Sequence, residues 1–181
     1  LRVFFEGFDP WTNLCHELGL PVRITRQDYE DYLYGTNANI YIPLCASVCK
    51  RSGAALLDET TRDVIAFYKK NGYRHVPMDG NPPDYIGQMC RFLEYLSVCA
   101  IKGQDTARSS QDFITQFLVD TVHEMQIAAG QYDAPADLRW ILGQLAEGVA
   151  RNPWTHREPD WQSFDSFSWN AQPEIPLEDP Y

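Results

Sequence analysis

The sequence lacks any hydrophobic run long enough to cross a membrane. None of its apolar stretches approaches the roughly 20 residues that a spanning helix requires. The first residues, LRVFFEGFDPW, are not expected to form a secretory signal peptide, because the apolar part is short and acidic residues follow at once. We therefore expect no membrane insertion. A starting Met is also missing, which predicts a chain that is trimmed or incompletely represented at its N-terminus.

Basic residues are scarce. The 181 residues include 15 Lys and Arg against 25 Asp and Glu, so the formal net charge is −10. Binding to nucleic acid needs clustered Lys and Arg that neutralise phosphates. The charge therefore argues against a nucleic-acid partner and favours a basic or neutral one.

Disulfide and metal-binding patterns are missing as well. The chain has five cysteines, an odd number, and no two of them form a CxxC pair. A chain of this size does not need disulfides, and free cysteines are commonly buried. We therefore predict that the cysteines are buried free thiols and that the protein is located in the reducing cytoplasm. Cys45 and Cys49 are four residues apart and would share a helix face, which leaves a metal or redox pair open, although two thiolates make an incomplete site.

Catalytic signatures are absent too. The chain has no glycine-rich phosphate loop and no GxSxG motif. His123-Glu124 begins like a zinc-binding helix motif, but Ile127 stands where the second histidine belongs. The four histidines are scattered, and no pair of acids is singled out by its spacing. We therefore predict a protein that is not an enzyme, with no catalytic residues, no metal site and no cofactor.

What the sequence does contain is a series of amphipathic helices. Thr25 opens a capping box before a helix that ends at Gly35, and Asp58 or Thr60 caps a helix that ends at Gly72. Further helices are expected over residues 81–96, 105–130 and 134–152. Because no alternating strand pattern and no repeat occur, the sequence predicts an all-α protein, a single compact bundle of five or more helices over residues 1–151.

Residues 152–181 differ from the rest. They hold five prolines and are acidic, yet they also contain five Trp and Phe residues, namely Trp154, Trp161, Phe164, Phe167 and Trp169. A disordered tail usually has fewer aromatic residues. We therefore predict an extended tail that packs on a surface of its own chain or of a neighbour. A bolder hypothesis is that this tail occupies the ligand groove and inhibits binding.

The stretch GNPPDYIGQMCRFLEYL, residues 80–96, combines a turn, an acidic residue and a mostly apolar helix. Asn81 is a good N-cap, and Pro82 suits the first helical position, where no N–H is needed. Asp84 then falls at the third helical position, where its carboxylate can bond back to the Asn81 N–H and meets the positive end of the helix dipole. This capping accounts for Asp84 without any function, and a ligand-facing role is the alternative.

Three segments, in order, carry a resemblance to a known family. DYEDYLYGT, then PLCASVCKRSGAALLDETTRDVIAFYKKNG, then NPPDYIGQMCRFLEYL are similar to motifs of the TorD/DmsD/NarJ chaperones. The resemblance covers about residues 28–151. Two features depart from the family pattern: Tyr85 replaces the histidine of its usual Pro-Asp-His, and Cys45 and Cys49 replace aromatic residues beside Ser47 and Val48.

The resemblance implies a TorD-like binding protein. Such chaperones work in the cytoplasm and recognise the N-terminal leader peptide of a molybdopterin-dependent oxidoreductase, often a twin-arginine export signal. They hold the enzyme until its cofactor is inserted, before export or assembly. An acidic protein with an apolar groove would complement the basic and apolar parts of such a leader. The family also implies a monomer or a homodimer that exchanges helices.

The resemblance further implies a peptide-binding set of residues. Asp84 is expected near an arginine of the leader, and Tyr85 as a wall that carries a hydroxyl. The full set is Tyr41, Leu44, Ser47, Val48, Pro83, Asp84 and Tyr85. Replacing Asp84 with Asn is accordingly predicted to weaken leader binding far more than it lowers the melting temperature. Two other functions stay open: an enzyme that binds or hydrolyses nucleotide, and an accessory subunit that remains bound to a redox complex.

Overall fold

The computed structural model describes residues 2–37, 39–50, 58–75 and 80–151, and these ranges are largely helical. No strand occurs among them, and the β-type pairing is limited to an isolated antiparallel bridge between Cys45 and Tyr85. The prediction of an all-α protein is confirmed. The tail predicted for residues 152–181 lies outside the described ranges, so the predicted division at residue 151 stays a prediction.

The described helices follow one another with mostly short connections. Their bounds are α1 Arg2–Glu6, α2 Phe8–Glu17, α3 Arg26–Leu33, α4 Ala46–Lys50, α5 Glu59–Lys70, α6 Ile86–Ile101, α7 Ala107–Phe113, the π-helical turn η1 Ile114–Leu118, α8 Val119–Gln131 and α9 Ala136–Ala150.

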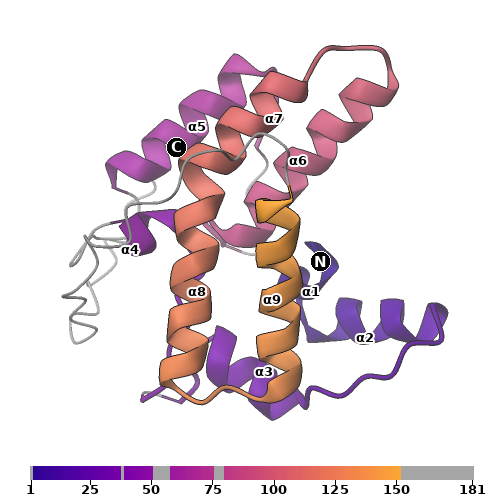
Figure 1. Cartoon of the computed structure of the whole chain (residues 1–181), viewed down its shortest axis with the longest axis vertical. Coiled ribbons are helices and arrows are strands. Elements are labelled where there is room, and N and C mark those ends of the chain that lie inside the picture. The colour runs from indigo at the N-terminus through magenta and orange to yellow at the C-terminus, as the bar shows by residue number, and fades with distance from the viewer. Residues whose placement is uncertain (1, 38, 51–57, 76–79, 152–181) are drawn as a thin grey trace.

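The antiparallel pair α8 and α9 runs along the long axis of the molecule (Figure 1). At one end of this pair Tyr32 of α3 donates a hydrogen bond to the Tyr132 carbonyl in the connecting turn, over 3.3 Å. Toward the other end lie α5, α6 and α7 (Figure 1). The short helix α4 contacts both α5 and α8, and α1 contacts both α2 and α6. Two short helices thus bridge the longer ones.

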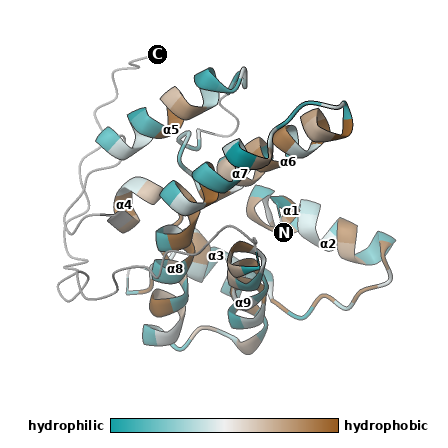
Figure 2. Cartoon of the chain, turned by 45° about the horizontal axis from the view of Figure 1, so that its top comes forward, coloured by the Kyte–Doolittle hydropathy of each residue, from teal (hydrophilic) through white to brown (hydrophobic). Residues whose placement is uncertain are grey.

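Each longer helix buries one face and exposes the other. On α5 the buried residues are Thr60, Thr61, Val64 and Tyr68, which is the spacing of one helix face. Figure 2 shows the same alternation of hydrophilic and hydrophobic residues along α5, α8 and α9. Among the described residues, no helix combines the length and the apolar character that spanning a membrane would require.

The long helix predicted over residues 105–130 is observed, but the π turn η1 interrupts it. A π turn bonds residue i to i+5, and here the Val119 N–H donates to the Ile114 carbonyl. Phe113, which directly precedes this turn, is fully buried. The Phe113 ring lies 4.7 Å from the Phe92 ring of α6 and 5.3 Å from the Phe67 ring of α5, measured between centroids. Phe113 therefore belongs to an aromatic core among α5, α6 and α7.

The helix ends follow the predicted signals closely in two cases. The Asp28 N–H donates to the Thr25 hydroxyl oxygen over 3.0 Å at the start of α3. The Thr60 N–H donates to the Asp58 carboxylate over 2.7 Å at the start of α5, which identifies Asp58 as the cap. Gly72, at φ 70°, follows the end of α5 in the left-handed region that glycine favours.

Candidate peptide-binding site

Two segments that the sequence analysis assigned to one site lie side by side. The Ala46 N–H donates to the Asp84 carbonyl over 3.0 Å, and the Ile86 N–H donates to the Leu44 carbonyl over 2.8 Å. These two bonds join the start of α4 to the start of α6 across about forty residues of sequence. The structure therefore brings together residues 44–48 and 83–85, and their role in peptide binding stays a prediction.

The Asp84 carboxylate lies inside this junction. It is fully buried, and it accepts a hydrogen bond from the Ser47 N–H over 2.8 Å and another from the Thr61 hydroxyl over 2.9 Å. The Ser47 N–H belongs to the first turn of α4, where backbone donors have no partner within the helix. Asp84 therefore caps α4 and ties it to α5.

This geometry corrects two expectations for Asp84. The helix α6 begins at Ile86 with Tyr85 as its N-cap, in extended backbone, so Asp84 precedes the helix and does not occupy its third position. The predicted capping box with Asn81 is therefore wrong. In this conformation the carboxylate is also enclosed, and the predicted contact with an arginine of a leader is not available to it.

Pro83 and Tyr85 are held by aromatic hydroxyls. The Tyr68 hydroxyl donates to the Pro83 carbonyl over 2.9 Å. The Tyr85 hydroxyl donates to the carbonyl of Phe5, in α1, over 2.7 Å. Tyr85 was predicted to line the peptide-binding site and to present its hydroxyl there. In the structure this hydroxyl bonds to a backbone carbonyl of the same chain.

The residues of the predicted peptide-binding set differ from one another in their exposure to solvent. Five of its members are buried: Leu44, Ser47, Pro83, Asp84 and Tyr85. Val48 is half-buried and Tyr41 is exposed. In this conformation only these last two offer a surface that a partner could reach.

A second buried carboxylate in this region was not predicted. Glu124 of α8 is 5% exposed, and its Oε1 atom has no hydrogen-bond partner among the described residues. The same holds for the fully buried Ser47 hydroxyl. One sequence signal could have identified Glu124, because it falls within the apolar helical pattern of Val122, Met125 and Ala128.

The pKa of Glu124 is raised, chiefly by burial and further by the charge of Asp120. A glutamate whose pKa is higher in the folded than in the unfolded state costs no stability below the unfolded pKa, about 4.3, and costs most above the folded pKa. We therefore expect Glu124→Gln to raise the melting temperature at pH 7 and to leave it nearly unchanged at pH 4. Thermal unfolding of both proteins across this range measures the difference. An equal gain at both pH values would contradict the assignment.

The two thiols beside Asp84 lie in the interior of the protein. Cys45 and Cys49 are free and buried, as predicted. Burial raises the pKa of both thiols well above the usual range, and the negative charge of Asp84 adds to this. Metals bind the thiolate form, so these neutral thiols are poor ligands. Among the described residues no group of three or more His, Cys, Asp or Glu side chains could hold a metal ion.

Comparison with known proteins identifies the family. A family model described as nitrate reductase delta subunit matches residues 23–124, which is more than half of the chain and includes both paired segments. No curated protein and no solved structure matches the chain. The match begins close to the start of the predicted resemblance and ends within α8. The chain belongs to the nitrate reductase delta subunit family, a NarJ/TorD-like family of redox-enzyme maturation chaperones.

Proposed function

We propose that this protein is a cytoplasmic chaperone that binds the N-terminal leader of a molybdopterin-dependent oxidoreductase. It holds the enzyme for cofactor insertion before export or assembly and performs no catalysis itself. The observation that carries the proposal is the family match over residues 23–124, because this range contains all seven residues of the predicted peptide-binding set.

The charge of the chain supports this partner. A leader with a basic part and an apolar part is attracted by a protein of net charge −10. Apolar contacts would then supply most of the affinity. Tyr41 and Val48, which reach the surface beside the buried junction, are proposed as contacts in the conformation described above.

Calorimetric titration tests the proposal directly. The probe is the synthetic leader peptide of a molybdopterin oxidoreductase from the same organism, and the control is a scrambled peptide of the same composition. We expect binding of the leader alone, since a scrambled copy keeps the charge but loses the helical order of apolar residues. Equal binding of both peptides, or of neither, would reject leader recognition.

A further inference from the structure

The N-terminal helix α1 is attached to the rest of the protein in the manner of a bound peptide. It has five residues, and both of its aromatic side chains are enclosed, Phe4 at 0% and Phe5 at 1% exposure. A helix this short leaves most of its backbone carbonyls without a partner inside the helix. Two of them are satisfied from outside: the Tyr29 hydroxyl donates to Phe4 over 2.6 Å, and the Tyr85 hydroxyl donates to Phe5 over 2.7 Å.

A glycine of α6, Gly87, allows the close packing of α1 on the surface beneath it. Gly87 lies in the first turn of α6, and a Cβ atom placed there would be 2.7 Å from Cε1 of Tyr85 and 3.3 Å from Cβ of Phe5. Only glycine therefore lets the Tyr85 ring and Phe5 approach the backbone of α6. We call the surface formed by Tyr29, Tyr85, Gly87, Arg91 and Glu94 the α1 seat.

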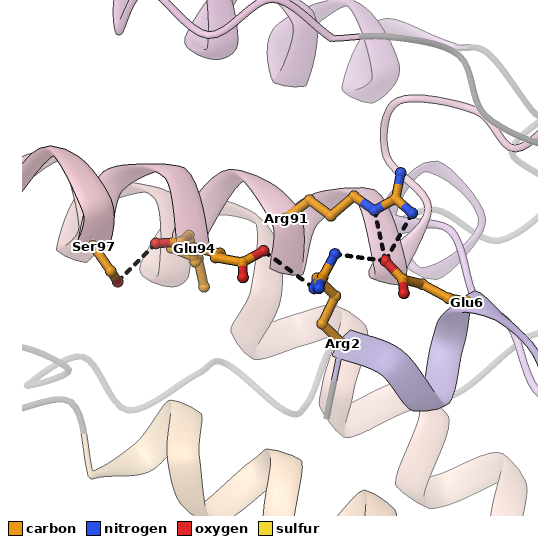
Figure 3. A network of polar contacts seen from close by, with 6 residues as sticks. Arg2, Glu6, Arg91, Glu94 and Ser97 are labelled. Carbon is orange, nitrogen blue, oxygen red and sulfur yellow. Dashed lines mark hydrogen bonds and ion pairs between the residues drawn. The ribbon is translucent and has the colours of Figure 1, made fainter. Parts of the chain in front are cut away.

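Ion pairs hold the rim of this seat. Arg2 of α1 lies 3.1 Å from the Glu94 carboxylate of α6, and Glu6 of α1 lies 2.7 Å from the Arg91 guanidinium of α6 (Figure 3). Arg2 and Glu6 also pair with each other over 2.7 Å. The α1 seat thus offers the Glu94 carboxylate to an arginine. It also encloses two large apolar side chains that come after this arginine in the sequence, and its tyrosine hydroxyls bond to their backbone carbonyls.

We propose that the α1 seat is the docking surface for the leader of the client enzyme, and that the leader binds there by replacing α1. This inference rests on the proposed function. The partner is a helical segment with an arginine followed closely by large apolar residues, which is the chemistry of Arg2, Phe4 and Phe5. The described conformation is then a filled site, and release of α1 makes Tyr85 accessible.

The family match supports a division between seat and occupant. All five residues of the α1 seat lie within residues 23–124, whereas α1 lies outside this range. The seat therefore belongs to the part of the chain that the family model describes. Its present occupant belongs to the part that the model does not match.

The test loosens α1 without altering the seat. The double variant Arg2→Ala, Glu6→Gln removes both ion pairs of the rim from the α1 side in the full chain. Its control is Glu147→Gln, Arg151→Ala, which removes a pair of the same kind on α9, 2.8 Å apart. A leader that must displace α1 has an apparent affinity reduced in proportion to the fraction of seats that are open. We therefore expect the α1 variant to bind it about tenfold more tightly and the control to match the unaltered protein.

A second probe tests the seat itself. The synthetic peptide LRVFFEGF, residues 1–8, is expected to compete with the leader for the α1 variant, whereas its copy with both Phe4 and Phe5 replaced by Ala does not. If the double variant fails to fold, Arg2→Ala alone takes its place. Equal leader affinity in variant and unaltered protein would overturn the inference and leave the proposed function standing. Binding of residues 1–8 without any binding of the leader would instead reject the proposed function, and with it the leader as occupant.

Discussion

Replacing Asp84 with Ala is expected to destabilise the protein by about 4 kcal/mol. The carboxylate is fully buried and accepts hydrogen bonds from the Ser47 N–H and the Thr61 hydroxyl. Each hydrogen bond to a charged group contributes roughly 1.5–3 kcal/mol, and the substitution leaves two donors buried without a partner. Chemical denaturation of the purified variant measures the loss.

A matched control separates this role from ordinary capping. Asp58 also accepts a backbone N–H, that of Thr60, but at the solvent-accessible start of α5. We expect Asp58→Ala to cost only about 1 kcal/mol, as for a typical N-cap. Equal losses in the two variants would show that burial adds nothing at Asp84. The same reasoning reverses the sequence-based expectation for Asp84→Asn: since the carboxylate joins α4 to α5, its loss lowers stability first, and any loss of binding follows from that.

The features predicted correctly from sequence depend on near neighbours. Thr25 and Asp58 cap their helices through N–H groups two or three residues away, so a short window of sequence contains both partners. The all-α class follows from helical spacing of the same short range, as on α5. The contact between residues 44–48 and 83–85, by contrast, joins partners about forty residues apart, which no short window of sequence contains.

The features predicted wrongly or not at all depend on distant partners. Asp84 suits a capping box with Asn81 by spacing, but the backbone bonds to Leu44 and Ala46 accompany an extended Tyr85, and α6 begins only at Ile86. The enclosure of Asp84 has the same origin. The helix α1 is too short to show any helical period, and its stability comes from Tyr29 and Tyr85, both far along the chain.

Gly87→Ala is expected to lower stability by up to about 2 kcal/mol, although it replaces glycine with the best helix former. The gain in helix propensity is about 1 kcal/mol. Against it stands the contact of 2.7 Å between the new Cβ and the Tyr85 ring, together with 3.3 Å to Cβ of Phe5. Overpacking of a buried site costs roughly 1–3 kcal/mol, and here the Tyr85 ring must shift for the side chain to fit. Thermal and chemical unfolding measure the net effect.

Gly143→Ala supplies the control, because Gly143 also lies inside a helix, α9, and nothing lies within 4 Å of its Cβ position. It is expected to gain up to about 1 kcal/mol. A double-mutant cycle then locates the strain at Gly87. Tyr85→Phe removes only the hydroxyl that bonds to Phe5, which costs about 1 kcal/mol in the unaltered protein. In the Gly87→Ala background the same change is expected to cost almost nothing, because the displaced ring no longer reaches that carbonyl. Additive losses would mean that the ring keeps its place, and the floor of the α1 seat would then tolerate a side chain at residue 87.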